Sequence, residues 1–396
     1  MARPAKPWFW KARKTWCVYH KGERVLLGPD RDEAFRQYHQ IMAKPEEKRQ
    51  PVDSSAVAAV LDDFLTWTSE NRAPDTYERY KRFIQSFVTL QGRRSISTLN
   101  TSHVTAWLNV QKGWNSTTKR NAITALQRGF NWAVTNRGLE RNPIRGMQKP
   151  EAKTRTTVIT AEEFAEILSH VAEAPFRDLL LVSYDSGIRP QETKQLEARH
   201  LQIDKQRAVI PGEEAKGGRT RVIYFPTERS LEIIKRLAGE RADGPLFRNS
   251  KGNPWTAFAV NLRFKRLQIA IGRKAMAERG VTSAVSEGDI ERLVQELPKT
   301  RLSKSTGRKT AKTPGELRGE ARRKLVAKEA MQYAKRFRQY DLRHTFVTRK
   351  LRAGVDSHLV AALAGHKDTK MIDSVYSHVA DDHEFMLAEA KKEIRR

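Results

Sequence analysis

Only one cysteine occurs among the 396 residues, and no run of about 18 consecutive apolar residues is present. With Cys17 alone, the chain can form neither an intramolecular disulfide nor a zinc site built from several cysteines. No segment is suited to span a membrane, and the basic, aromatic N-terminus lacks the apolar centre of a signal peptide. We therefore expect a soluble protein of the reducing cytoplasm that is not exported.

Acidic residues are outnumbered by basic ones. Asp and Glu total 46 and Lys and Arg total 74, so the formal net charge is +28. Solubility does not need so large an excess, which therefore favours a polyanionic partner. Nucleic acid is the first candidate and an anionic membrane surface is the second. The length of the chain predicts two or three domains, each with its own core.

The first 45 residues predict a small sheet backed by one helix. Aromatic and β-branched runs in residues 8–28 break at Lys21-Gly22, where we expect a hairpin turn, and residues 30–43 have helical periodicity. This segment is either a structural cap or an arm-type DNA-binding module. In the second case, the residues that contact phosphate are Lys11, Arg13 and Lys14. Residues 46–55 are polar, contain a proline and predict a linker.

Residues 56–147 predict a compact helical bundle, because apolar residues recur with helical periodicity in four segments. The segments are residues 57–67, 75–88, 102–110 and 116–136. Basic residues accumulate on the outward positions of the bundle. They are Arg79, Lys81, Arg82, Lys119, Arg120 and Arg128. These charges form either an ordinary solvated surface or a DNA-binding face.

Residues 157–396 predict a further domain of mixed structure. Thr160 and Glu163 form a capping box at its first helix, and helical patterns dominate the segments that follow. Residues 207–212 and 221–226 predict two strands joined by a tight hairpin at a Gly-Gly pair. We therefore expect the whole chain to be mainly α with small β-sheets, which is an α+β fold.

A basic insertion occupies about residues 273–338 of this domain. Residues 299–312 contain no acidic residue and predict a flexible loop. The loop either contacts phosphate or is a disordered insertion without a role. Its candidate contacts are Lys304, Arg308 and Lys309.

The segment QYDLRHTFVT, residues 339–348, predicts the start of a helix that Asp341 caps. Arg343 and His344 would then lie beside the positive end of the helix dipole. This arrangement suits an anion such as phosphate.

Four more chemically capable residues lie at the ends of predicted elements. Arg189 follows a helix that a glycine ends, and Lys216 lies near the tip of the hairpin. His366 follows another glycine-terminated helix, and Tyr376 lies on the next helix. Together with Arg343 they could serve one phosphodiester, with the arginines on the non-bridging oxygens and Tyr376 as the nucleophile. Taken alone, each has an ordinary explanation, such as a solvated arginine, a core tyrosine or a histidine that complements a helix dipole.

Four segments of the sequence resemble the tyrosine recombinases, a family that includes the phage integrases. They are SYDSGIRPQETKQL (183–196), AKGGRTRVIYFP (215–226), YDLRHTFVTRKLRAGV (340–355) and LAGHKDTKMIDSVYSHV (363–379), in the family's order. The resemblance covers most of residues 157–380 directly, and the bundle and N-terminal sheet agree with the family in architecture. It implies that residues 56–147 are a helical core-binding domain and that residues 157–396 are the catalytic domain.

The resemblance also implies a role for each member of the constellation. Arg189 and Arg343 clamp the scissile phosphate, and His366 donates a hydrogen bond to it. Lys216 is the general acid for the leaving 5′ oxygen, and Tyr376 is the nucleophile.

Two further positions matter for this comparison. Glu192 fits the acidic position that supports the active site in the family. Tyr340 departs from the pattern, because the family usually has histidine there. The long insertion before Gln339 is a second departure. A tyrosine hydroxyl can still donate a hydrogen bond, but it is a poorer base than imidazole near neutral pH. We therefore expect Tyr340 to be a donor; the alternative is that it only packs behind Arg343.

The reaction that the resemblance implies is site-specific strand exchange through a 3′-phosphotyrosyl intermediate, for integration or excision of a mobile element. The partners would be double-stranded DNA in the nucleoid, further copies of the chain in a synaptic tetramer, and an accessory DNA-bending or directionality factor. No cofactor, metal or nucleotide is implied, and the sequence has neither a two-metal carboxylate cluster nor a GK[ST] loop. The alternatives are a type IB topoisomerase and a non-cleaving DNA-binding regulator of the same fold.

Overall fold

The computed structural model describes residues 7–10, 15–20, 23–43, 55–152, 157–241, 243–302, 307–370, 372 and 383–391. It divides into two units, Met1–Lys153 and Thr154–Arg396. The described residues are mainly helical and contain three small antiparallel sheets, so the predicted α+β class is confirmed. Within the described ranges, no helix combines the length and the apolar character needed to cross a membrane.

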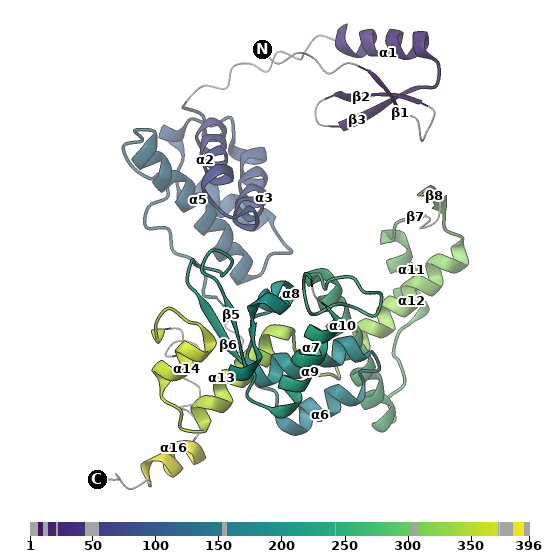
Figure 1. Ribbon diagram of the computed structural model, residues 1–396. Helices are drawn as coiled ribbons and strands as arrows, with labels where there is room; N and C mark the ends of the chain where they lie inside the picture. Colours follow the sequence, from purple (N-terminus) through teal and green to yellow (C-terminus); the bar gives the residue numbers. More distant parts are fainter. Residues whose placement is uncertain are drawn as a thin grey trace. The chain divides into compact units, whose positions relative to one another are not determined.

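A three-stranded antiparallel sheet and one helix form the N-terminal module (Figure 1). Its elements are β1 (Trp8–Trp10), β2 (Thr15–His20), β3 (Glu23–Gly28) and α1 (Arg31–Ala43). The strands pair in sequence order, and Val18, Leu27 and Ala34 form the buried core between sheet and helix. The predicted sheet and helix are confirmed. The predicted turn at Lys21-Gly22 and the predicted phosphate contacts lie outside the described residues; these contacts are Lys11, Arg13 and Lys14.

The four predicted helices of the bundle are confirmed to within a few residues. They are α2 (Val57–Asn71), α3 (Pro74–Gln91), α4 (Thr101–Val110) and α5 (Ser116–Asn136). The side-chain oxygens of Asn100 and Asn115 accept backbone N–H groups at the starts of α4 and α5. Helices α2 and α5 approach closely at Gly129, where a Cβ atom would lie 2.8 Å from Leu61 Cδ2. The glycine therefore lets this pair of helices pack.

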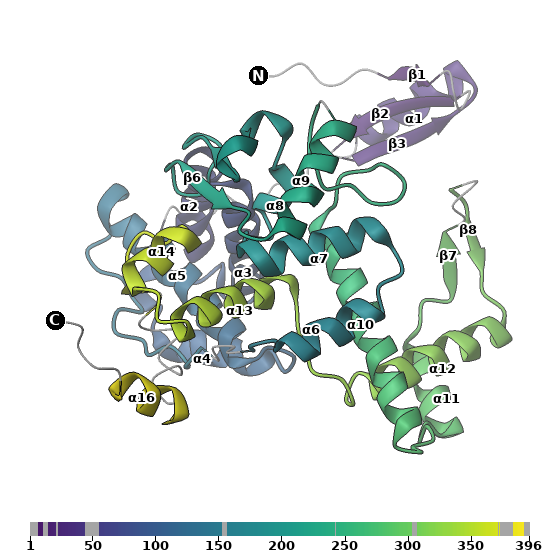
Figure 2. The same cartoon turned by 60° about the horizontal axis from the view of Figure 1, so that its bottom comes forward.

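The second unit is built around α7 (Ala174–Ser186) and α13 (Gln339–Arg352), which pack side by side (Figure 2). Other helices of this unit are α6 (Ala161–Ser169), α8 (Glu192–Gln195), α9 (Glu228–Glu240), α10 (Ala257–Glu278), α14 (Ser357–Ala364) and α16 (His383–Ala390). The predicted capping box of α6 is confirmed, because Thr160 Oγ1 accepts from Glu163 N and Glu163 Oε2 accepts from Thr160 N.

A small antiparallel sheet in the second unit has the order β4–β5–β6. Its strands are β4 (Leu201–Gln202), β5 (Arg207–Ile210) and β6 (Arg221–Tyr224). Ile210 pairs with Arg221, so a loop of ten residues, 211–220, joins β5 to β6. The expectation of a tight hairpin at the Gly-Gly pair is therefore wrong. Turns inside the loop close it instead, for example where Ala215 N donates to Pro211 O.

The basic insertion contains a small folded element. Helices α11 (Glu287–Glu296) and α12 (Pro314–Ala330) pack through Ile290, Leu297, Leu317 and Ala321, and the hairpin of β7 (Thr300–Leu302) and β8 (Lys309–Ala311) joins them. The hairpin extends away from α12 in both views (Figures 1 and 2). The expectation of a flexible loop over residues 299–312 is wrong for the described part.

The reason is that the base of the hairpin is held on α12. Lys312 N donates to Lys299 O, Arg301 pairs with Glu316, and Lys312 Nζ lies 2.7 Å from Glu320 Oε2. The acidic partners, Glu316 and Glu320, come from the following helix. The composition of the loop itself therefore gave no sign of them.

Candidate functional site

Two glycines end the helices that frame the site. Gly187 follows α7 with φ 62° and Gly365 follows α14 with φ 66°, both in the left-handed region that favours glycine. Neither position has room for a side chain. A Cβ atom would lie 2.3 Å from the ring of Phe346 at the first glycine and 2.7 Å from Arg221 Cδ at the second. The carbonyl groups of both glycines are therefore held in fixed places.

Each of the two predicted clamp arginines binds the carbonyl of one of these glycines. Arg343 is 1% exposed, and its Nη1 donates to Gly187 O over 2.7 Å while its Nη2 donates to Ala364 O. Arg189 Nη2 donates to Gly365 O over 2.5 Å. Helix α13 is thereby connected to the end of α7, and the turn after α7 to the end of α14.

The sequence analysis placed Arg343 directly after the helix cap, beside the positive end of the helix dipole, and the structure differs. Helix α13 begins at Gln339, and Asp341 is its third residue, where its carboxylate accepts from Arg338 N over 2.8 Å. Arg343 is therefore in the second turn, beyond the free N–H groups that would strengthen an anion site. Its charge is set among carbonyl groups instead.

Glu192 is the carboxylate of this cluster. It accepts from the backbone N of Arg189 over 2.9 Å, from Arg189 Nη1 over 2.6 Å and from Arg221 Nε over 3.3 Å. Burial opposes its ionisation, but attraction to Arg221 and the hydrogen bonds from Arg189 outweigh burial and lower the pKa of Glu192. The carboxylate is therefore ionised at neutral pH.

Arg221 is a site residue that the sequence did not single out. It is 4% exposed, and its Nη1 donates to Leu363 O over 2.8 Å. One signal could have found it, since alternation along β6 places Arg221 on the same buried face as Ile223. An arginine at a core-facing strand position needs a partner, and Glu192 supplies one.

Positive charge exceeds negative charge in this cluster. Three guanidinium groups, those of Arg189, Arg221 and Arg343, share Glu192, which leaves a net charge of three minus one, or +2. Burial and repulsion from the other two arginines lower the pKa of Arg343 to about 10, so it remains protonated at neutral pH. The cluster is suited to receive an anion.

His366 is neutral in this environment. Burial and repulsion from Arg343, Arg189 and Arg221 lower its pKa to about 4. Its Nε2 lies 3.0 Å from Arg343 Nη2, and because a guanidinium only donates, Nε2 accepts and the hydrogen of the neutral ring lies on Nδ1. Within the described residues, Nδ1 is buried without a hydrogen-bond partner. Nδ1–H is therefore an unsatisfied buried donor within the described part of the chain.

A cleft of about 310 Å³ opens beside the cluster. Its lining includes Arg189, Glu192, Arg221 and His366 together with Lys216. Lys216 lies in the exposed loop between β5 and β6, next to Gly217 and Gly218, which have φ 95° and 70°. The structure therefore brings Lys216, on one strand connection, to the same cleft as the residues at the two helix ends.

Tyr340 is not among the residues that line this cleft. Tyr340 is 44% exposed in the first turn of α13, where its ring contacts the edge of His344 with 4.9 Å between ring centroids. Tyr376 and Lys304 lie outside the described residues.

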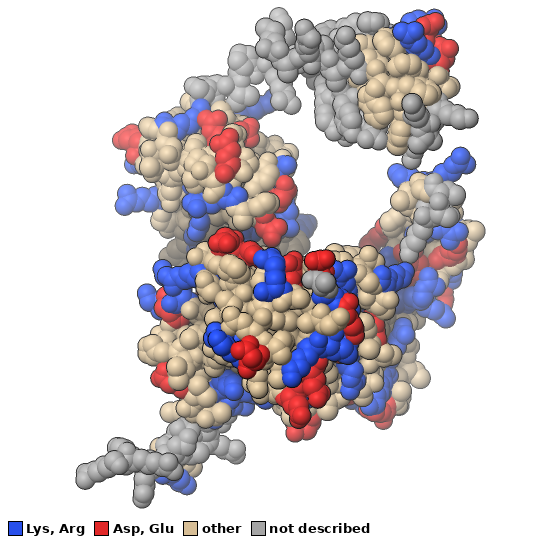
Figure 3. Space-filling view, viewed as in Figure 1, with Lys and Arg blue, Asp and Glu red and all other residues tan. Residues whose placement is uncertain are grey.

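The predicted DNA contacts of the bundle are at its surface. Arg79, Lys81 and Arg82 lie over the rings of Tyr80, Tyr77 and Phe83 on α3. On α5, Arg120 donates to Pro150 O over 3.1 Å, Lys119 is half-buried and Arg128 is exposed. In the insertion, Arg308 and Lys309 are exposed. On the face seen in Figure 3, basic and acidic side chains are interspersed, so the excess charge does not form one patch there.

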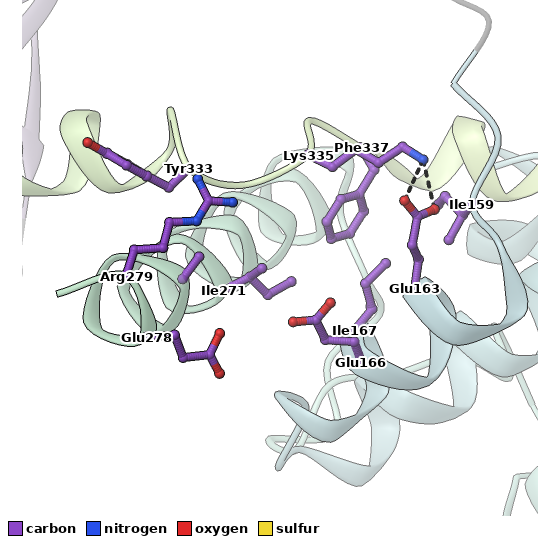
Figure 4. Close-up of a pocket in the computed structure, with 11 residues that line it drawn as sticks. Ile159, Glu163, Glu166, Ile167, Ile271, Glu278, Arg279, Tyr333, Lys335 and Phe337 are labelled. Carbon is purple, nitrogen blue, oxygen red and sulfur yellow. Dashed lines mark hydrogen bonds and ion pairs between the residues drawn. The ribbon is translucent and has the colours of Figure 1, made fainter. Parts of the chain in front are cut away.

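A second pocket, of about 270 Å³, lies between α6, α10 and residues 333–337 (Figure 4). Its floor is apolar, Glu163 pairs with Lys335 over 2.7 Å, and Glu166 and Glu278 point toward one another. The carboxylates of Glu166 and Glu278 repel a negatively charged phosphate, which disfavours its binding in this pocket. The cleft at Arg189 is therefore the candidate site. Among the described residues, no group of three or more His, Cys, Asp or Glu is placed to hold a metal ion.

Comparisons with known proteins agree with this geometry. The model of the Phage integrase family matches residues 157–282 and 281–383. Tyrosine recombinase XerC of Xylella fastidiosa (strain M23) is 23% identical over 225 residues, covering 53% of this chain and 76% of that protein. XerC of Escherichia coli O139:H28 (strain E24377A / ETEC) is 24% identical over 229 residues, covering 54% and 76%.

Two solved structures share the fold. The Tn1549 transposon integrase in complex with circular intermediate DNA has a TM-score of 0.57 at 16% identity, over 86% of this chain and 100% of that chain. A lambda integrase dimer bound to a COC′ core site has a TM-score of 0.52 at 14% identity, over 98% and 96%.

Proposed function

We propose that this chain, which belongs to the phage integrase family, is a site-specific DNA recombinase. It cleaves and rejoins DNA strands through a 3′-phosphotyrosyl intermediate. One observation carries the proposal: Arg189, Arg221, the neutral His366 and the exposed Lys216 line one cleft, and Arg343 lies 3.0 Å from His366, so that the cluster has a net charge of +2. A phosphodiester carries one negative charge, and the pentavalent transition state carries two. The cleft therefore favours the transition state over the ground state.

In the cleavage step, the hydroxyl oxygen of Tyr376 bonds to phosphorus and the bond from phosphorus to the 5′ oxygen breaks. The tyrosine proton passes to water, and the ammonium group of Lys216 gives a proton to the leaving 5′ oxygen. A free 5′ hydroxyl of the partner strand then reverses the linkage. Because the phosphotyrosyl bond conserves the energy of the phosphodiester, we propose that the cycle needs neither nucleotide nor metal.

The remaining residues hold the phosphate. Arg189 and Arg343 bind its non-bridging oxygens, Glu192 orients Arg189, and His366 donates a hydrogen bond to it. Tyr340 donates a further hydrogen bond from the first turn of α13.

The rest of the chain would bind and assemble on duplex DNA. We propose residues 1–45 as an arm-site module, 46–55 as a linker, 56–147 as the core-binding domain and 157–396 as the catalytic domain. The fold shared with a lambda integrase tetramer bound to a Holliday junction, at a TM-score of 0.51, supports a homotetramer in synapsis. The likeness to a transposon integrase supports integration or excision of a mobile element. We further propose that an accessory DNA-bending or directionality factor assists the reaction.

A suicide substrate tests the proposal. In a nicked duplex that carries the element's own end sequence, cleavage releases a short fragment that bears the free 5′ hydroxyl. Once this fragment diffuses away, the linkage cannot be reversed and a covalent protein–DNA adduct accumulates. The wild-type chain should form this adduct, and Tyr376→Phe should bind the same DNA with similar affinity and form none. DNA binding without an adduct in the wild type would indicate a non-cleaving regulator. Relaxation of supercoiled DNA that lacks paired sites would indicate a topoisomerase.

A further inference from the structure

The loop that carries Lys216 has few anchors of its own. Lys216, Gly217, Gly218, Arg219 and Thr220 are all exposed, and the two glycines have left-handed backbone conformations. The position of the lysine ammonium group therefore depends on how the loop is fastened at its two ends.

The end of the loop after β5 is fastened by Glu214. Arg199 Nη1 and Nη2 donate to its two carboxylate oxygens over 2.7 and 2.9 Å, and His200 Nε2 lies 3.1 Å away. Gln195 Nε2 also donates to the backbone oxygen of Glu214. One residue, Ala215, separates this anchor from Lys216 along the chain, so it restrains the first half of the loop.

The end of the loop before β6 is fastened by Arg221. Its guanidinium reaches Glu192 through Nε and the carbonyls of Leu363 and Val222 through Nη1, and its stem lies against Gly365. One side chain thus joins the loop to the carboxylate that holds Arg189 and to the helix end that presents His366.

This connection is not explained by stability alone. A buried ion pair gains little over well-packed apolar side chains, because desolvation offsets most of the attraction. Burial lowers the pKa of Arg221, and repulsion by Arg189 adds to this effect. Lysine could not replace it, because a single ammonium group cannot reach Glu192 and Leu363 O in the fixed directions that a guanidinium provides.

We propose that Arg221 is a positioning residue that places Lys216 for protonation of the leaving 5′ oxygen. This inference rests on the proposed function, in which Lys216 is the general acid. Arg221→Lys keeps the positive charge of the cluster but loses the contacts that hold the loop, so its effect should resemble the loss of an acid rather than the loss of a clamp.

A substrate with sulfur in place of the bridging 5′ oxygen tests this role. In its cleavage the tyrosine oxygen bonds to phosphorus, the phosphorus–sulfur bond breaks, and the 5′ thiolate leaves without a proton, because a thiol is far more acidic than an alcohol. Arg221→Lys should cleave the ordinary phosphodiester about a hundredfold more slowly than wild type, the lower range for loss of general acid catalysis. On the sulfur substrate it should come within about threefold of wild type.

Two control variants bracket the outcome. Lys216→Ala should be rescued by sulfur in the same way, whereas Arg343→Ala should stay slow on both substrates. If Arg221→Lys is equally slow on both substrates, or normal on both, the inference is wrong. If wild type cleaves neither substrate, the proposed function itself fails.

A second variant keeps the test open if Arg221→Lys does not fold. Glu214→Gln weakens the other anchor of the same loop and leaves the buried cluster intact. It should also be slowed on the ordinary substrate and rescued by sulfur. A Glu214→Gln variant that sulfur does not rescue would show that the loop anchors do not act through Lys216.

Discussion

Replacing Gly187 by alanine tests the packing that holds Arg343. The left-handed backbone at φ 62° costs an alanine about 1–2 kcal/mol. The new Cβ atom would also lie 2.3 Å from Phe346 Cδ1, and relieving such overpacking costs about 1–3 kcal/mol more. The expected loss in the free energy of unfolding is therefore roughly 2–5 kcal/mol.

Gly252 provides a matched control in the same unit. It also has a left-handed backbone, with φ 76°, but a Cβ atom there would meet nothing within 4 Å. Gly252→Ala should therefore lose only the backbone contribution, about 1–2 kcal/mol. Urea unfolding of the two variants gives the comparison, and equal losses would refute the close approach of Gly187 to Phe346.

Gly187→Ala should also slow cleavage. Gly187 O accepts the hydrogen bond from Arg343 Nη1, so a shift of the turn displaces one clamp arginine. At a temperature where both variants stay folded, Gly187→Ala should cleave at least about tenfold more slowly than Gly252→Ala, since a small misplacement of a clamp weakens transition-state binding. Adding Phe346→Leu to Gly187→Ala makes room for the new Cβ atom, so the double variant should regain part of the lost stability and part of the lost cleavage rate.

Three other predictions follow from the site and the surfaces. Tyr340→Phe should slow single-turnover cleavage by roughly ten- to a thousandfold if Tyr340 is a transition-state donor, and a rate within about twofold of wild type would mean that it only packs. His366 has a pKa of about 4 in the folded chain, below its ordinary value, so the unfolded chain binds a proton first as the pH falls. The free energy of unfolding of wild type should therefore decrease relative to that of His366→Asn between about pH 6.5 and 4. Parallel curves of unfolding free energy against pH would contradict the burial of a neutral ring. Neutralising the three basic residues of the insertion should flatten the log–log salt dependence of DNA binding by roughly 0.9 per lost phosphate contact, and an unchanged slope would exclude such contacts; these residues are Lys304, Arg308 and Lys309.

Local patterns in the sequence predict most of the helices. The bundle follows from apolar periodicity, and α6 follows from the Thr160–Glu163 box, because both signals lie within a few residues of the element they define. The helix after residue 338 was misplaced because its start depends on Arg338, which is not a common capping residue. Helix α11 was missed although Ser286 and Asp289 form a capping box there.

Contacts between distant residues could not be predicted in this way. Gly187 meets Arg343 across 156 positions, and Arg189 meets Gly365 across 176. The motifs showed that these residues can bind phosphate, but only the fold shows that each arginine is held by the carbonyl of a helix end. The burial of Arg221 and the neutral state of His366 follow from the same contacts.

The use of carbonyl groups explains how the cluster stays positive. If carboxylates neutralised every guanidinium, the buried charges would be balanced without DNA, but no net positive charge would remain to bind phosphate. The last turns of α7 and α14 instead turn their carbonyl groups toward the arginines, and a helix C-terminus carries a partial negative charge. These dipoles solvate the buried guanidinium groups while leaving their net charge unchanged. A helix end that is closed by glycine can therefore stabilise a cation and still leave it able to bind an anion.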